Sequence, residues 1–125
     1  MRIDPDSKTK RRKTMDKHGI VILADNPKKA DEISAAFEKS GRFTILGKTS
    51  DGEEGVGLIL KTEAEYAVVD LILSGLDGLG VLDRLSAYRS KTKIIVYTSL
   101  SSEEVVETCI SKGAAFYVAK PCPTE

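Results

Sequence analysis

Residues 20–41 read IVILADNPKKADEISAAFEKSG, and this stretch gives the clearest indication of the fold. Its first five residues form an unbroken apolar run of strand length, which is typical of a strand covered on both faces. Pro27 suits the first turn of a helix, and Ile33 and Phe37 follow at helical spacing. Gly41 marks the end of that helix. The stretch therefore predicts a buried strand followed directly by an amphipathic helix.

The same alternation of strand and helix repeats along the chain. Further strands are predicted at residues 42–47, 66–70, 93–98 and 114–119, and further helices at 50–63, 77–90 and 101–113. The helix at 50–63 is the weakest of these, because each of its two interior glycines costs about 1 kcal/mol relative to alanine. Strands that alternate with helices are joined by right-handed crossovers and lie parallel. The sequence therefore predicts an α/β fold with a doubly wound, five-stranded parallel sheet.

Composition is that of an ordinary globular domain. The chain has 125 residues, of which 41% are hydrophobic and 30% are charged. Its 19 basic and 19 acidic residues cancel, so the net charge gives no reason to expect nucleic acid as a partner. No apolar run approaches the roughly 20 residues that a membrane span needs. With Cys109 and Cys122 in neither a metal spacing nor a disulfide framework, we expect a reduced, cytoplasmic protein without a membrane partner.

The two ends of the chain differ in character from the middle. Residues 1–18 are polar, basic and without periodicity, and we expect a disordered arm or an expression remnant there. The regular alternation begins at Gly19, so residues 19–125 are predicted to form the folded domain.

Polar side chains stand where four of the five predicted strands end: Asp25, Asp70, Thr98 and Lys120. In open parallel sheets, ligands bind beyond the carboxyl ends of the strands. Two carboxylates repel by roughly 4 kcal/mol at 4 Å with an effective dielectric constant near 20, so they invite a hard cation such as Mg²⁺. The hydroxyl and the ammonium could then hold an anion with several oxygens, such as a phosphoryl group.

Each of these residues also has an ordinary structural explanation. An aspartate or a threonine after a strand is often the cap of the next helix, and a lysine there often extends into solvent. Taken one by one, these explanations are the stronger ones. Taken together, polar residues at the ends of four strands favour a functional site.

Four segments in a fixed order resemble the receiver domain of bacterial two-component response regulators. They are ILADNP at 22–27, VVDLILSGLDGLGVLDRL at 68–85, IIVYTS at 94–99 and KGAAFYVAKP at 112–121. The segment DGLGVLDRL at 77–85 is especially similar to the receivers of sporulation regulators. The resemblance covers about four fifths of the chain. It implies a flavodoxin-like strand order 2-1-3-4-5, with helices one and five on one face of the sheet and helices two to four on the other.

The resemblance implies a phosphorylation site with bound Mg²⁺. Asp70 matches the aspartate that accepts a phosphoryl group from the phosphohistidine of a histidine kinase or a phosphotransfer protein. Asp25 and Asp70 match the carboxylates that ligate Mg²⁺, and Ile72 matches the residue whose backbone carbonyl completes the protein ligands. Such a domain is not an enzyme in the usual sense, although it catalyses its own phosphorylation and dephosphorylation.

The resemblance also implies a switch and an output. Thr98 matches the hydroxyl that closes onto the phosphoryl group, and Lys120 matches the ammonium that pairs with it. Pro121 matches a proline with a cis peptide bond, and Tyr117 matches the aromatic side chain that turns inward with the threonine. We expect the signal to leave through the fourth helix and fifth strand, toward a DNA-binding domain in a longer parent protein.

Three departures from the family pattern have consequences. The usual first acid of the pair after strand one is Ala24, so we expect weaker Mg²⁺ binding than in a typical receiver. The usual Met-Pro is Leu73-Ser74, which removes the restriction that proline imposes on the loop. The chain stops at Glu125 without a fifth helix, so we expect a truncated receiver whose open apolar face is covered in a homodimer.

Three other functions are alternatives to a phosphorylated receiver domain. Ala24 and Ser74 support a degenerate receiver that acts as an interaction module independent of phosphorylation, whereas the remaining site residues argue against it. An aspartyl-phosphate phosphatase or mutase commonly has a second acid two residues after the nucleophile, where this chain has Ile72. A flavin carrier of similar topology would need a glycine- and hydroxyl-rich phosphate loop, and residues 24–29 (ADNPKK) do not form one.

Overall fold

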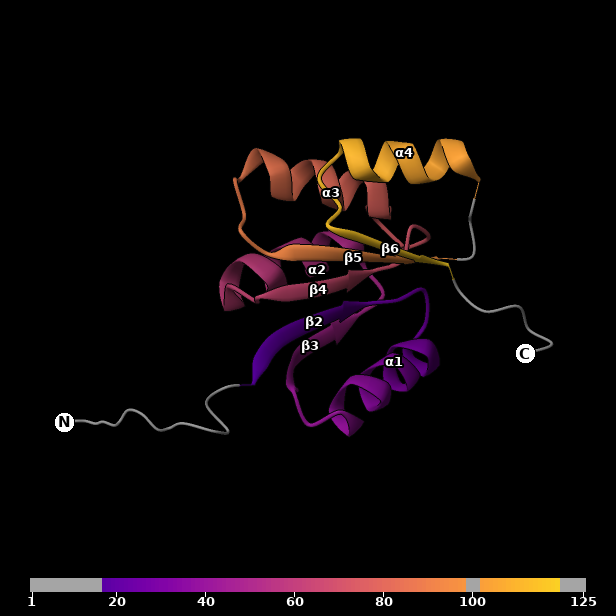
Figure 1. The fold of residues 1–125 in the computed structure, drawn as a ribbon. Coiled ribbons are helices and arrows are strands. Elements are labelled where there is room, and N and C mark those ends of the chain that lie inside the picture. The colour runs from indigo at the N-terminus through magenta and orange to yellow at the C-terminus, as the bar shows by residue number, and fades with distance from the viewer. Residues whose placement is uncertain (1–16, 99–101, 120–125) are drawn as a thin grey trace.

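The computed structural model describes residues 17–98 and 102–119. Within these residues, strands and helices alternate as the sequence predicts (Figure 1). In chain order they are β2 (His18–Leu23), α1 (Pro27–Lys39), β3 (Phe43–Thr49), α2 (Gly52–Thr62), β4 (Tyr66–Val69), α3 (Gly78–Ala87), β5 (Lys93–Thr98), α4 (Glu103–Ser111) and β6 (Phe116–Ala119).

The five strands form one parallel sheet in the order β3-β2-β4-β5-β6. Counted along the chain this order is 2-1-3-4-5, so the predicted flavodoxin-like topology is confirmed. The direction of winding reverses at β2, because β3 lies on one side of it and β4 on the other. This reversal is where ligands bind in open α/β sheets.

Alternation along each strand divides the core into two layers. On β2, Val21 and Leu23 join the apolar cluster beneath α2, α3 and α4, whereas Ile20 and Ile22 join the cluster beneath α1. All four side chains are fully buried, which explains why the strand reads as a continuous apolar run. Figure 1 shows α1 on one side of the sheet and α3 and α4 on the other.

Side-chain caps fix where each helix begins. Asn26, Asp51, Asp77 and Ser102 each accept a hydrogen bond from a backbone N–H in the first turn of the helix that follows. The caps come two to four residues after β2, β3 and β5 and eight residues after β4. The chain after β4 is therefore the longest connection at this edge of the sheet.

Two strands are longer than the apolar pattern indicates. β2 begins at His18, which pairs with Phe43 and whose Nδ1 lies 2.6 Å from Oε1 of Glu65. β3 continues past Gly47 to Thr49, whose backbone carbonyl accepts a hydrogen bond from Ala24 N at 3.1 Å. Neither extension has an apolar side chain, since they consist of His18-Gly19 and Lys48-Thr49, so hydrophobicity alone does not reveal them.

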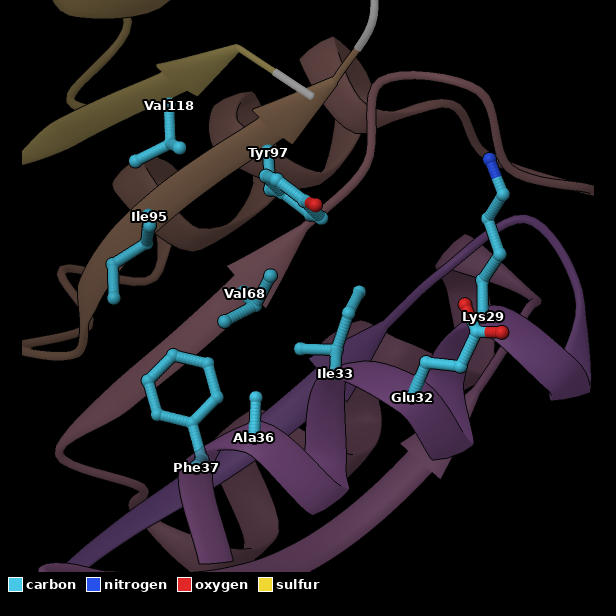
Figure 2. A pocket seen from close by; sticks show the side chains of 9 residues that line it. All are labelled: Lys29, Glu32, Ile33, Ala36, Phe37, Val68, Ile95, Tyr97 and Val118. Atoms are coloured by element: carbon cyan, nitrogen blue, oxygen red, sulfur yellow. The ribbon is translucent and has the colours of Figure 1, made fainter. Parts of the chain in front are cut away.

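An apolar groove lies on the α1 side of the sheet, with a volume of about 440 Å³. Figure 2 shows side chains of α1 and of three strands directed into the same space. The lining residues are Lys29, Glu32, Ile33, Ala36, Phe37, Val68, Ile95, Tyr97 and Val118. On the edge strand β6, Phe116 and Val118 are 53% and 45% exposed. Among the described helices, α1 covers β2 and β3, and the face of β5 and β6 on this side stays accessible.

Candidate functional site

The strand register brings the predicted site residues to one edge of the sheet. Leu23 pairs with Val69, and Val69 pairs with Val96, so β2, β4 and β5 end side by side. Asp25 follows β2 by two residues, and Asp70 directly follows β4. Thr98 is the last residue of β5 and pairs with Ala119 of β6.

Asp70 is the buried acid of this edge. Its residue is only 2% exposed, and its Oδ1 accepts a hydrogen bond from the backbone N–H of Ile72 at 3.1 Å. Its own N–H donates to the carbonyl of Leu23 at 2.9 Å, which ties it to the neighbouring strand. A carboxylate is rarely buried to this extent unless it has a charge partner or a functional role, because burial disfavours the charged form.

Asp25 lies at the surface, and the cap of α1 is its neighbour Asn26. The side-chain oxygen of Asn26 accepts from Lys29 N at 2.8 Å, whereas Asn26 Nδ2 lies 3.5 Å from Oδ1 of Asp25, a long contact. Capping therefore does not explain Asp25. The alternative explanation considered for Asp25, that it caps the next helix, does not hold, because Asn26 provides that cap.

Ala24 occupies a buried position at the same edge. It is 1% exposed and belongs to the apolar cluster beneath α1. Ala24 directly follows β2 and Asp70 directly follows β4, each one residue past the Leu23–Val69 pair, so the two residues are neighbours at the ends of adjacent strands. An acid at position 24 would thus stand in an apolar environment beside Asp70.

The two predicted switch residues lie on the α4 side of the sheet. Thr98 is fully buried, in the same alternation as Ile94 and Val96, which belong to the cluster beneath α2, α3 and α4. Tyr117 packs against that cluster and is half-buried. Burial raises the pKa of Tyr117, and the nearby Cys109 raises it further.

Cys109 of α4 is a buried thiol in the apolar cluster beneath α2, α3 and α4. It is 0% exposed, and its burial raises the pKa of the thiol. The protonated thiol is therefore favoured, and it behaves as a small apolar side chain of the core.

Three residues named from the sequence lie outside the described part of the chain: Lys120, Pro121 and Cys122. The predicted ammonium, the cis peptide bond before Pro121 and the state of Cys122 therefore stay predictions.

The donors at this edge suit Mg²⁺ better than a softer metal. The carboxylates of Asp25 and Asp70 and the backbone carbonyl of Ile72 offer oxygen alone, the ligand type that Mg²⁺ prefers. Within residues 17–98 and 102–119, no group of three or more His, Cys, Asp or Glu side chains is arranged to hold a metal ion. Two carboxylates with a carbonyl fit an ion that keeps several waters.

Sequence reasoning missed two features around Asp70. Gly78, the first residue of α3, approaches the end of β4 so closely that an added Cβ would lie 2.5 Å from the carbonyl oxygen of Asp70. In addition, Ser50 and Gly52 exchange backbone hydrogen bonds with Ser74. The Asp-Gly pairs at 51–52 and 77–78 are the signal that could have drawn attention to both places, since each glycine follows a helix cap.

A family model and individual relatives of known name agree on one family for this chain. Residues 20–125 match the family model described as the response regulator receiver domain. The nitrate/nitrite response regulator protein NarL of Escherichia coli (strain K12) is 27% identical over 106 residues, 85% of this chain and 49% of NarL. The transcriptional regulatory protein LiaR of Bacillus subtilis (strain 168) is 29% identical over 101 residues, 81% of this chain and 48% of LiaR.

Solved structures agree on the fold. The CheX-CheY-BeF3-Mg complex from Borrelia burgdorferi contains a chain that superposes with a TM-score of 0.78 at 23% identity, covering 84% of this chain and 79% of that chain. The chain thus spans about half the length of the two curated relatives and most of this structural neighbour. Within the described residues, no helix has both the length and the apolar character needed to cross a membrane.

Proposed function

The chain belongs to the response regulator receiver domain family of two-component signalling, and we propose that Asp70 is its phosphoryl acceptor. The observation that carries the proposal is the buried carboxylate of Asp70 at the end of β4, at the reversal of the sheet, held by the N–H of Ile72. The finer resemblance to sporulation regulators stays a prediction.

In the proposed reaction, an oxygen of Asp70 bonds to phosphorus as the phosphorus–nitrogen bond of a donor phosphohistidine breaks. The hydrogen bond from Ile72 orients the carboxylate for this transfer. Phosphoryl transfer depends mainly on positioning and on neutralising charge. The hydroxyl of Thr98 would donate a hydrogen bond to one phosphoryl oxygen, and the ammonium of Lys120 would offset the charge of another. In this role the domain catalyses its own phosphorylation and the later hydrolysis of the acyl phosphate.

Asp25, Asp70 and the carbonyl of Ile72 would hold Mg²⁺. When bound, the ion offsets the negative charge of the two carboxylates and of the incoming phosphoryl group. Position 24 has no acid, so we expect weaker binding than a receiver with two adjacent acids would show. Support for the site comes from the oxygen-only donors at the carboxyl ends of adjacent strands.

The donor would be a histidine kinase or a phosphotransfer protein, and the output would act on transcription. Thr98 and Tyr117 both face the α4 side of the sheet, so closure of Thr98 onto a phosphoryl group would be felt by α4 and β6. NarL and LiaR are about twice as long as the matched region, which supports a DNA-binding output domain in a longer parent protein.

Phosphorylation can be tested by incubating the protein with Mg²⁺ and acetyl phosphate and weighing it intact. We expect a mass gain of one phosphoryl group, lost in Asp70→Asn and in the presence of EDTA. Asp77→Asn is the matched control, because an asparagine can still accept the capping hydrogen bond of α3. It should keep the mass gain. No gain in the wild-type protein would instead favour an interaction module independent of phosphorylation.

We also propose that a second copy of the chain covers the apolar groove beside α1. The groove and the exposed Phe116 and Val118 form a continuous apolar surface along the edge strand β6. A two-fold axis places the same patch on both subunits, so an apolar strip meets an apolar strip. Lys29 and Glu32, side chains of opposite charge on α1, lie at one end of the groove and offer each copy a polar rim (Figure 2).

Light scattering over a concentration series tests this association. We expect a reversible dimer with a dissociation constant of about 10–100 μM, and at least tenfold weaker association in Val118→Lys, since a buried charge in an interface costs more than about 1.4 kcal/mol. Ile110→Lys is the control, because Ile110 is 50% exposed on α4, away from the groove. A strict monomer at high concentration would overturn the proposal.

A further inference from the structure

We propose that the loop after β3 holds the loop after β4 in position for metal binding, through a small parallel bridge centred on Asp51 and Ser74. The bridge makes Gly52 and Ser74 positioning residues for the carbonyl of Ile72. This inference rests on the proposed Mg²⁺ site, and it adds Ser50 and Gly52, which follow β3, to a site whose proposed ligands follow β2 and β4.

The bridge lies beyond the end of the sheet. Inside the sheet, β2 separates β3 from β4, so these two strands do not pair. Past the end of β2 their continuations meet: Ser74 N donates to Ser50 O at 3.0 Å, and Gly52 N donates to Ser74 O at 2.9 Å. The hydroxyl of Ser74 also donates to Ser50 O at 3.0 Å. Three hydrogen bonds therefore join two loops that are 24 residues apart in sequence.

Serine at position 74 is suited to this contact in a way that proline is not. Proline has no backbone N–H, so it could not donate to Ser50. Ser74 lacks the ring by which proline restricts the backbone. Its N–H and its hydroxyl instead both donate hydrogen bonds to Ser50 O. The loop is therefore held in place in spite of the lost proline.

Gly52 allows the close approach on the other side of the bridge. A Cβ added to Gly52 would lie 1.7 Å from the carbonyl oxygen of Leu76, a backbone atom that cannot move alone. Any side chain here would push the start of α2 away from the loop that carries Ile72 and Ser74.

These contacts fix the loop at both ends around Ile72. On one side the N–H of Ile72 donates to Asp70, and two residues later Ser74 is joined to Ser50 and Gly52. The Ile72 carbonyl lies between these two anchors along the chain. Groups that orient a metal ligand from behind typically change metal affinity by about 10- to 100-fold when they are lost.

The test compares Mg²⁺ affinity with stability in the same variants. Mg²⁺ alone is titrated against backbone amide shifts, at a temperature where every variant is fully folded, and thermal unfolding is recorded separately. We expect Gly52→Ala to bind Mg²⁺ about tenfold more weakly. Ser74→Ala, which loses only the hydroxyl bond, should bind about threefold more weakly, and Ser74→Thr should restore the wild-type value. Gly57→Ala is the matched control in α2, because nothing lies within 4 Å of its added Cβ.

The outcomes separate this inference from the proposed site. Weaker Mg²⁺ binding in folded Gly52→Ala and Ser74→Ala, with Gly57→Ala unchanged, supports the bridge as a positioning device. Wild-type affinity in both variants, with only a lower melting temperature, overturns it and leaves the Mg²⁺ site intact. If the wild-type protein itself shows no Mg²⁺-dependent shifts, the proposed site fails, and the inference fails with it.

Discussion

Ala24→Asp is expected to lower the free energy of unfolding by about 2–4 kcal/mol in EDTA, and saturating Mg²⁺ should restore most of that loss. Ala24 is 1% exposed among apolar side chains, so a carboxylate there would lose its hydration. It would also stand beside the buried Asp70 on the neighbouring strand, and two such charges repel by roughly 4 kcal/mol at 4 Å. A divalent cation removes both penalties at once.

The measurement is urea unfolding of the wild-type protein and the variant, each in EDTA and in Mg²⁺. Binding to the folded state alone stabilises by about 2.7 kcal/mol at a hundredfold excess over the dissociation constant, and the tighter site gains more at any fixed Mg²⁺ concentration. Ala24→Asn is the control: it has similar volume and polarity without charge, so it should lose stability and gain no additional response to Mg²⁺. An equal Mg²⁺ response in wild-type and Ala24→Asp proteins would contradict the assignment of this edge as the metal site.

Gly78→Ala is expected to destabilise the fold by about 2–3 kcal/mol and to slow phosphorylation of Asp70. The added Cβ would lie 2.5 Å from the carbonyl oxygen of Asp70 and 2.6 Å from Cα of Leu71. Both are backbone atoms, so α3 must move away from the end of β4 or the backbone that carries the acceptor must shift. The hydrogen bond from Gly78 N to Leu71 O, now 3.0 Å, would weaken in either case.

Urea unfolding gives the stability, and the rate of mass gain with acetyl phosphate gives the effect on the acceptor. Gly57→Ala is the comparison, since it makes the same chemical change at an exposed helical position with open space around it. It should stabilise the protein by about 0.5–1 kcal/mol, because alanine favours the helix. If Gly78→Ala were as stable as Gly57→Ala, that result would contradict the close contact between Gly78 and the backbone at the end of β4.

Much of the fold could be predicted from local sequence. Strands β2 and β4 were found because they are buried on both faces, which makes them continuous apolar runs. The start of α1 could be predicted because Pro27 suits the first turn of a helix. Strand ends then gave Asp25, Asp70 and Thr98, because parallel strands bring their carboxyl ends to one edge whatever fills the loops.

Other features depend on residues that are distant in sequence, and no local pattern carries them. The polar ends of β2 and β3 are strand because partner strands lie beside them, with His18 opposite Phe43 and Thr49 opposite Leu23. The groove beside α1 exists because α1 packs over one side of the sheet only as far as its contacts with β2 and β3 reach.

That this chain is an α/β domain with acids at the ends of adjacent strands follows from its amino-acid pattern, because burial and strand direction are local or additive properties. How the site is supported depends on contacts between distant parts of the chain. These contacts bury Ala24 beside Asp70, and they join Ser50 and Gly52 to Ser74 across the end of a strand that separates them in the sheet. Backbone N–H and C=O groups are the same in every residue except proline, so the sequence does not show which two residues such a hydrogen bond joins.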